Sequence, residues 1–227
     1  LNLTVKSDKP VVLVGAMRPA TAVSADGPLN IINAVKVAVD VASAGQGVLV
    51  MMNDEIYSGR DVTKTNTANV ATFKATNCGP LGFIVGGEVH YYYRSVRPHT
   101  LQSEFDVTGV TALPRVDIIY THIGEDRVFV DAALAAGARG LIYAGSGMGS
   151  IHEAVEAALA EAVGRGVVVV RSSRTGSGIV AAGLERWQEQ GFLYADNLNP
   201  QKARLLLQLA LLRTQERSEV QEIFSRY

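Results

Sequence analysis

Cysteine is nearly absent from the sequence, which has only Cys78 among 227 residues. A single thiol excludes an internal disulfide framework and cannot by itself form a metal site. Because a lone cysteine is usually a small packed hydrophobe, we expect Cys78 to be buried. The histidines also lack metal-ligand spacing, and we expect them to be exposed or hydrogen-bonded structural residues: His90, His99, His122 and His152. We therefore predict neither a metal nor a cofactor that depends on one.

An excess of charge of one sign is lacking too, since 21 Lys and Arg face 22 Asp and Glu. Without a strong field, neither nucleic acid nor a membrane surface is an expected partner. No apolar run approaches the roughly 20 residues that span a bilayer. The first residues, "LNLTVKSDKP", lack the pattern of a signal peptide and begin without Met, so we expect the chain to start inside a domain.

Several catalytic motifs are missing as well. The segment "AGSGMGSIHEA" at 144–154 has glycines spaced G-x-G-x-G, which matches neither the Rossmann fingerprint nor a Walker loop. We interpret it as a tight strand-to-helix turn with Ser150 as the N-cap. A G-x-S-x-G elbow is absent, so a hydrolase of the α/β-hydrolase type has no support.

What the chain does contain is a regular alternation of apolar runs and helical patterns, with 48% hydrophobic residues. This alternation indicates an α/β fold of two domains with mainly parallel sheets. In the first half we predict strands at 10–17 and 47–53, a loop or short hairpin at 54–61, and a hairpin at 79–95 that turns at Gly86 and Gly87. A helix at 29–43 would place Ile31, Val35, Ala38 and Val39 on one face.

The alternation resumes after an aperiodic stretch at 96–114, which we interpret as a linker. We predict strands at 115–122, 139–147 and 167–173 and helices at 126–138, 150–166, 199–214 and 216–227. Asn199 is a plausible N-cap, with Pro200 in the first helical position. We predict two domains. The first, 1–95, would have an incomplete sheet, and the second, 115–227, would be a compact three-layer domain.

The stretch "GRDVTKTNTANVATF" at 59–73 is too polar for a core strand and too rich in threonine for a helix. Packing therefore does not explain it. A lysine such as Lys64 is usually a solvated charge, but beside a carboxylate and hydroxyls it can help to deprotonate a nucleophile. No nucleophile stands out locally, so its hydroxyl partner is expected elsewhere. Arg171, Ser172, Ser173 and Arg174 could bind an anion or form a solvated loop.

Five blocks resemble the bacterial type II L-asparaginase and glutaminase-asparaginase family: "KPVVLVGAMRPATAVSADGPLN", "MNDEIYSGRDVTKTNT", "GPLGFIVGG", "VVVVRSSRTGSG" and "NLNPQKARLLLQLAL". The resemblance runs in order from Leu1 to Tyr227. It implies hydrolysis of L-asparagine, and in some members of L-glutamine, by a threonine nucleophile without metal or organic cofactor. It further implies a periplasmic homotetramer, built as a dimer of intimate dimers with active sites at subunit boundaries.

The same resemblance assigns three site residues. Lys64 in "DVTKTN" matches the family's catalytic lysine, which supports a threonine and an aspartate. Ser150 matches the position from which a side chain contacts substrate in the neighbouring subunit's site. Glu185, placed by its spacing from "RSSR", matches the glutamate that approaches the substrate ammonium group.

One departure from the family matters most. The "TGGTI" and "HGTDT" motifs, which carry the family's threonines and aspartate, do not occur in these 227 residues. We expect the chain alone to be inactive, because amide hydrolysis then lacks a positioned nucleophile and oxyanion donors. The alternatives are a non-catalytic remnant with an oligomerisation role and a subunit of a tRNA-dependent amidotransferase, which the near-neutral charge disfavours.

Overall fold

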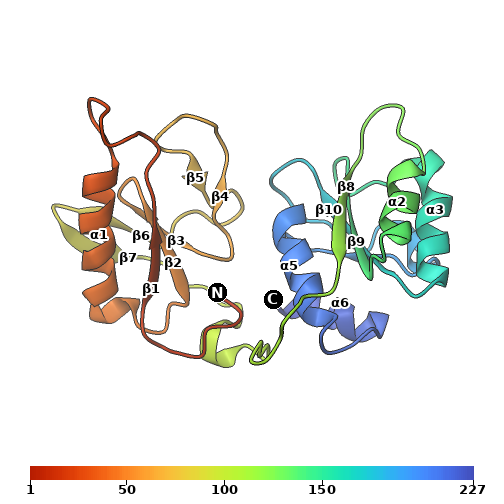
Figure 1. Cartoon of the computed structure of the whole chain (residues 1–227). Helices are drawn as coiled ribbons and strands as arrows, with labels where there is room; N and C mark the ends of the chain where they lie inside the picture. Colours follow the sequence, from red (N-terminus) through yellow and green to blue (C-terminus); the bar gives the residue numbers. More distant parts are fainter. The chain divides into compact units, whose positions relative to one another are not determined.

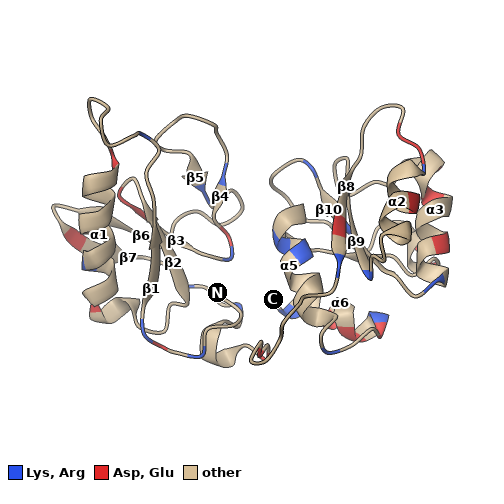
Figure 2. Cartoon of the chain, in the orientation of Figure 1, with Lys and Arg blue, Asp and Glu red and all other residues tan.

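The computed structural model describes all 227 residues, which form two compact units, Leu1–Val107 and Thr108–Tyr227 (Figure 1). Each unit combines a β-sheet with helices, and the predicted α/β class is confirmed. Acidic and basic side chains are interspersed on both units (Figure 2). None of the helices combines the length and hydropathy that a bilayer crossing requires.

The sheet of the first unit has five strands in the order β1-β2-β3-β6-β7. Only the pair β1 (Val11–Val14) and β2 (Val48–Met52) is parallel. The other neighbours are antiparallel, so the sheet is mixed: β3 (Glu55–Ser58), β6 (Gly82–Val85) and β7 (Glu88–Tyr91). A mixed sheet arises because tight turns, which join antiparallel strands only, connect β2 to β3 and β6 to β7.

Both of these turns use left-handed backbone. Gly86 and Gly87 have φ of 60° and 83°, as a two-residue hairpin turn requires, and the hairpin predicted at 79–95 is confirmed. Asn53 and Asp54, with φ of 53° and 61°, form the β2–β3 turn. Asn and Asp tolerate this conformation better than other residues with a side chain. The segment predicted as a loop or short hairpin at 54–61 instead contains strand β3, which forms a hairpin with β2.

Helix α1 (Gly27–Val39) packs on this sheet through Asn30, Asn33, Ala34 and Val37, which are buried. The apolar face that the sequence pattern singled out points to solvent, with Ile31, Val35 and Val39 exposed by 58, 57 and 76%. The side of the helix that faces the sheet instead carries asparagine side chains, which make specific contacts there. Asn30 donates to Gly15 O at 3.0 Å, and Asn33 donates to Asp54 Oδ1 at 2.7 Å.

The aperiodic stretch at 96–114 is partly tied to the first unit. It contains a 3-10 helix, η2 (Thr100–Gln102), and Thr100 N donates to Asn2 O at 2.8 Å. Ser103 Oγ donates to Leu3 O at 2.6 Å. His99 is buried and shares a hydrogen bond of 3.0 Å with Thr100 Oγ1, as expected of a structural histidine. The domain limits at 95 and 115 stay predictions.

Cys78, by contrast, is exposed. The expectation of a packed thiol is wrong, because the residue follows a turn in which Cys78 N donates to Ala75 O at 3.1 Å.

The second unit has a fully parallel sheet in the order β11-β10-β9-β8. Its strands are β8 (Val116–Tyr120), β9 (Gly140–Gly145), β10 (Val168–Ser173) and β11 (Leu193–Tyr194). Helices α2 (Val128–Ala135) and α3 (Glu153–Gly164) cover one face, while α5 (Pro200–Ala210) covers the other and α6 (Arg217–Arg226) packs on α5 (Figure 1). The predicted strands and helices of this half are confirmed to within a few residues at their ends.

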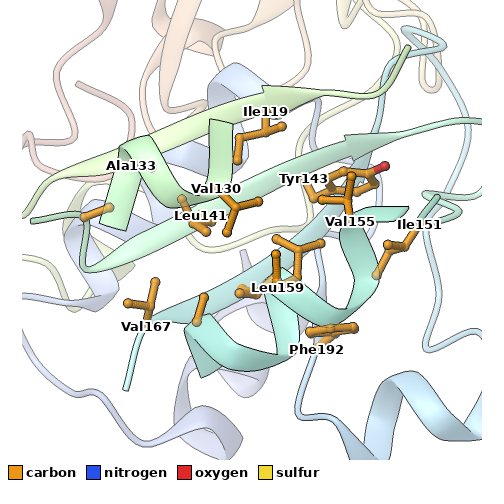
Figure 3. Close-up of a cluster of buried hydrophobic side chains, with 14 of the residues drawn as sticks. Ile119, Val130, Ala133, Leu141, Tyr143, Ile151, Val155, Leu159, Val167 and Phe192 are labelled. Atoms are coloured by element: carbon orange, nitrogen blue, oxygen red, sulfur yellow. The ribbon is translucent and has the colours of Figure 1, made fainter. Parts of the chain in front are cut away.

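Figure 3 shows the core between the sheet and α2 and α3, where Leu141, Val130, Val155 and Leu159 are completely buried. On the other side, α5 begins as predicted, since Asn199 Oδ1 accepts from Lys202 N at 3.0 Å and Pro200 stands at the start. A further short helix, α4 (Glu185–Glu189), was not expected from the sequence.

Candidate active site

Lys64 lies in a small hairpin of the first unit. Strand β4 (Thr63–Lys64) pairs antiparallel with β5 (Phe73–Lys74), so that Lys64 faces Phe73 in the register. The lysine is exposed, and its ammonium group makes no hydrogen bond or ion pair within the chain. The hairpin thus presents a free cation to solvent and gives it neither a carboxylate nor a hydroxyl partner.

Two of the threonines around Lys64, Thr65 and Thr72, have a local structural role. Thr65 N and Oγ1 both donate to Thr72 O at 2.8 Å. Thr72 Oγ1 in turn accepts from Asn66 N at 2.7 Å and donates to Asn66 O at 2.5 Å. Threonine hydroxyl groups that form hydrogen bonds with nearby backbone favour a turn over a helix, which explains why this stretch is rich in threonine.

The hairpin is fastened to the main sheet through Lys74. Its Nζ lies 2.7 Å from Glu55 Oε2, and the same oxygen accepts from Tyr57 OH at 2.5 Å. Burial, followed by the hydrogen bond to Glu55, raises the pKa of Tyr57, which is fully buried. Lys74 therefore holds the hairpin in place, while Lys64 on the partner strand remains unpaired.

Ser150 ends the glycine-rich loop between β9 and α3. Ser150 N donates to Ser146 O at 2.9 Å, and Gly147 and Gly149 have φ of 51° and 76°. A Cβ on Gly145 would lie 2.4 Å from Ser150 O, so the loop requires glycine at that position as well. These constraints fix the backbone from which the exposed Ser150 side chain projects.

The predicted capping role of Ser150 is wrong. The N-cap of α3 is His152, whose Nδ1 accepts from Ala154 N at 3.3 Å. The helix starts later than expected because Tyr143 OH accepts from His152 N at 3.2 Å and holds that residue in extended backbone. The Ser150 hydroxyl, which makes no hydrogen bond within the chain, is consequently available to a ligand.

Glu185 is the first residue of α4 and is exposed, without a hydrogen bond or ion pair within the chain. The helix is held by Glu156 of α3, whose Oε2 accepts from Trp187 Nε1 at 3.1 Å and whose Oε1 accepts from Arg186 Nε at 3.0 Å. Burial alone would raise the pKa of Glu156, but the hydrogen bonds from Arg186 and Trp187 outweigh it and lower the pKa.

Arg171 is a residue whose role the sequence did not reveal. Its side chain is completely buried in β10, and its guanidinium lies 4.5 Å from the centre of the Trp187 ring. It donates to Gly149 O at 3.4 Å and to Ala182 O at 2.7 Å, and also to Ala181 O. It is therefore not available to an anion.

The neighbouring serines are used in a similar way. Ser172 Oγ donates to Leu198 O at 2.9 Å, and Ser173 Oγ donates to Gly147 O at 2.5 Å. Arg174 Nη1 donates to Thr121 O at 2.7 Å. These side chains therefore bond backbone carbonyls of adjacent loops, and the buried Arg171 and Ser172 belong neither to a solvated loop nor to an anion site.

Two of the three predicted site residues thus belong to one unit and are linked through a shared neighbour. Ser150 comes directly after Gly149, and Glu185 comes three residues after Ala182. Arg171 donates hydrogen bonds to the carbonyl oxygens of Gly149 and Ala182 and so connects the two segments. Lys64 belongs to the other unit. No three His, Cys, Asp or Glu side chains gather in a group that could hold a metal ion.

Two family models match the chain. The model "Asparaginase, N-terminal" matches residues 1–97, and the model "Glutaminase/Asparaginase C-terminal domain" matches residues 115–224.

Individual relatives agree with these matches. L-asparaginase 2 of Escherichia coli is 49% identical over all of the chain, which spans 66% of its length. A glutaminase-asparaginase of Pseudomonas fluorescens is 44% identical over all of the chain, which spans 63% of its length. The crystal structure of a probable cytoplasmic L-asparaginase from Campylobacter jejuni is 47% identical with a TM-score of 0.97, covering all of this chain and 74% of that one. The chain, which spans less than two thirds of these two curated relatives, belongs to the glutaminase/asparaginase family.

Proposed function

We propose that the chain forms part of an L-asparaginase-type amidohydrolase, which converts L-asparagine to L-aspartate and ammonia, with L-glutamine as a second candidate substrate. The observation that carries the proposal is that Lys64, Ser150 and Glu185 are all exposed and free of partners within the chain, in a protein of this family. Structural lysines and glutamates are normally solvated too, but here all three occupy motif positions of the family.

In this mechanism a threonine hydroxyl attacks the side-chain amide, and Lys64 assists the transfer of its proton. The attack forms a bond from the threonine oxygen to the amide carbon and, on collapse, expels ammonia; water then hydrolyses the ester. Ser150 and Glu185 bind the amino acid, with Glu185 directed to its ammonium group. Carboxylate and ammonium form a charge-assisted hydrogen bond, which favours an α-amino acid as substrate.

The nucleophile comes from a polypeptide segment outside these 227 residues. Two of the threonines near Lys64, Thr65 and Thr72, are committed to the turn, and Lys64 Nζ has no hydroxyl partner. The 227 residues alone are therefore proposed to be inactive. The working enzyme is a homotetramer, a dimer of intimate dimers, in which Ser150 and Glu185 serve the site of a neighbouring copy.

The location is proposed to be periplasmic, as in type II members of the family, although the Campylobacter relative is described as a probable cytoplasmic enzyme. Epitope-tagged protein in osmotic-shock fractions tests this point.

Ammonia release from L-asparagine tests the function. We compare the 227-residue chain, the same chain fused to the part of the Escherichia coli relative that the 227 residues do not cover, and the fusion with Lys64→Met. We expect no activity in the 227-residue chain and clear activity in the fusion, which Lys64→Met reduces by roughly 10²–10⁴-fold, the usual contribution of a general acid–base group. Lys9→Met is the matched control, since Lys9 is also exposed but lies outside the site.

Release of ammonia by the 227-residue chain alone would contradict the assignment of the nucleophile. A folded but inactive fusion would favour the alternative, a non-catalytic remnant with an oligomerisation role. Circular dichroism and sedimentation velocity on the same samples separate these outcomes from misfolding.

A further inference from the structure

Arg171 connects two backbone segments that are far apart in the sequence. Its Nη1 donates to Gly149 O at 3.4 Å, in the loop that ends with Ser150. Its Nη2 donates to Ala182 O at 2.7 Å and to Ala181 O, in the segment that leads to Glu185. One guanidinium therefore bonds the backbone beside both predicted ligand-binding side chains of this unit.

The surroundings leave the guanidinium little freedom. Trp187 packs over it, with 4.5 Å from the guanidinium carbon to the ring centre. A Cβ on Gly183, which has φ of +75°, would lie 2.8 Å from Nη1 and 2.9 Å from Nη2. Glycine at 183 thus permits both the left-handed turn and the close approach of the cation.

Packing alone does not explain a charge at this place. The side chain is completely buried, no carboxylate pairs with it, and its Nε has no hydrogen-bond partner. Burial lowers the pKa of Arg171 to about 10. An apolar side chain of similar volume would fill the space without the desolvation penalty of a charge. What it would not do is hold three carbonyls of two separate segments in a fixed arrangement, which a planar guanidinium does.

We propose that Arg171 is a positioning residue for substrate binding, which fixes the Ser150 loop (145–150) and the segment 181–185 relative to each other so that Ser150 and Glu185 contact the same amino-acid ligand. The inference rests on the proposed function for the identity of the ligand. The tether itself is independent of that function and can be tested without activity.

The first test is amide hydrogen exchange by NMR on the 227-residue chain. Two amides report on the tethered segments: Ser150 N, bonded to Ser146 O at 2.9 Å, and Trp187 N, bonded to Leu184 O at 3.0 Å. In Arg171→Met we expect both to exchange at least about 10-fold faster, while amides inside α5 keep their rates, since local opening leaves other parts of a unit protected. Arg171→Lys retains the charge but not the fork, and we expect an intermediate effect.

A second variant guards against misfolding of Arg171→Met. Gly183→Ala places a Cβ against the guanidinium and 2.9 Å from Cε3 of Trp187, which packs on it, and should accelerate the same two amides. Gly166→Ala is the matched control, because Gly166 also has a positive φ, of +83°, but a Cβ there would meet nothing within 4 Å. Both alanines carry the strain of left-handed backbone, and only the one at 183 disturbs Arg171.

The second test uses the active fusion with L-asparagine. We expect Arg171→Met and Gly183→Ala to raise KM by about 10-fold or more and to change kcat by less than about 3-fold, because the nucleophile and Lys64 are not touched. Gly166→Ala should change neither constant, and Arg171→Lys should partly restore KM.

The two proposals can fail separately. Faster exchange at Ser150 and Trp187 in an enzyme that never hydrolyses asparagine would support the tether and overturn the proposed function. Unchanged exchange, or a fall in kcat at constant KM in an active fusion, would overturn the positioning role. Uniform acceleration of all amides in both Arg171→Met and Gly183→Ala would also overturn it, since that is the behaviour of a merely structural residue.

Discussion

Tyr57 and Glu55, two residues apart in β3, are joined by a hydrogen bond of 2.5 Å from the phenol to the carboxylate. The phenol belongs to a completely buried side chain, and the carboxylate also pairs with Lys74 of the hairpin that carries Lys64. A buried hydroxyl thus depends on the same carboxylate that fastens a surface hairpin.

We predict that Glu55→Ala destabilises the first unit by about 1–3 kcal/mol, because it leaves the Tyr57 phenol buried without an acceptor. In a Tyr57→Phe background the same substitution should have a clearly smaller effect, since no orphaned hydroxyl remains. Urea unfolding followed by circular dichroism gives the four free energies of the cycle. Strict additivity of the two substitutions would contradict the shared role of Glu55.

The folded-state pKa of Glu156 lies below its ordinary value of 4.5, because bonds from Arg186 and Trp187 favour the carboxylate despite its burial. Stability from this lowered pKa is fully present above pH 4.5 and is lost as the pH falls through the folded-state value. We predict that Glu156→Gln destabilises the second unit by about 1–2 kcal/mol at pH 7 and that the difference narrows toward pH 3.

Chemical denaturation of both proteins at several pH values between 3 and 7 measures this difference. If the difference in the free energy of unfolding between the two proteins stays constant over this pH range, the ionisation of Glu156 does not contribute to stability. Glu161→Gln serves as a comparison, since Glu161 lies on the same helix but its carboxylate is exposed and pairs with Arg127 at the surface.

Gly145 and Gly147 offer a matched test of the Ser150 loop. A Cβ on Gly145 would meet backbone at 2.4 and 2.6 Å, whereas a Cβ on Gly147 would meet nothing within 4 Å. We predict that Gly145→Ala costs about 2–3 kcal/mol and shifts the NMR signals of Ser150, since backbone has to move. Gly147→Ala should cost only about 1 kcal/mol, from its left-handed φ. Equal effects of the two on thermal unfolding would mean that the loop is not closely packed.

Asn199 caps α5 through the bond from Lys202 N, 3.0 Å long. We predict that Asn199→Ala destabilises the second unit by about 1 kcal/mol, and that Asn199→Asp restores most of this, since aspartate accepts the same bond. Thermal unfolding by calorimetry measures both. A loss in Asn199→Asp as large as in Asn199→Ala would show that contacts other than the cap dominate.

Local signals made much of the fold predictable. Gly86 and Gly87 predict a two-residue hairpin turn, and Asn199 followed by Pro200 predicts the start of a helix. Both signals can be recognised because a turn and a helix cap each depend on only a few neighbouring residues. Periodicity predicted the helix but did not show that its buried face carries Asn30 and Asn33, because their bonds go to backbone and side chains that are distant in the sequence.

The candidate site also has features that the sequence predicts and features that it does not. The motif around Lys64 could be recognised from sequence, but the roles of its threonines in the turn depend on pairing across the hairpin. From the sequence, Arg171 could belong to an anion site or to a solvated loop, whereas its neighbours in space are the carbonyls of Gly149 and Ala182 and the ring of Trp187. Contacts between segments more than ten residues apart carry no local pattern.

Trp187 is the chain's single tryptophan, and its indole is buried between Arg171 and the carboxylate of Glu156. The protein therefore contains a built-in fluorophore that is confined to one of its two units. Emission excited selectively at the indole follows the melting of Thr108–Tyr227, while far-ultraviolet ellipticity averages over the whole polypeptide. Without any label, the two spectroscopic signals together can reveal whether the halves of the molecule lose their structure in one step or in two.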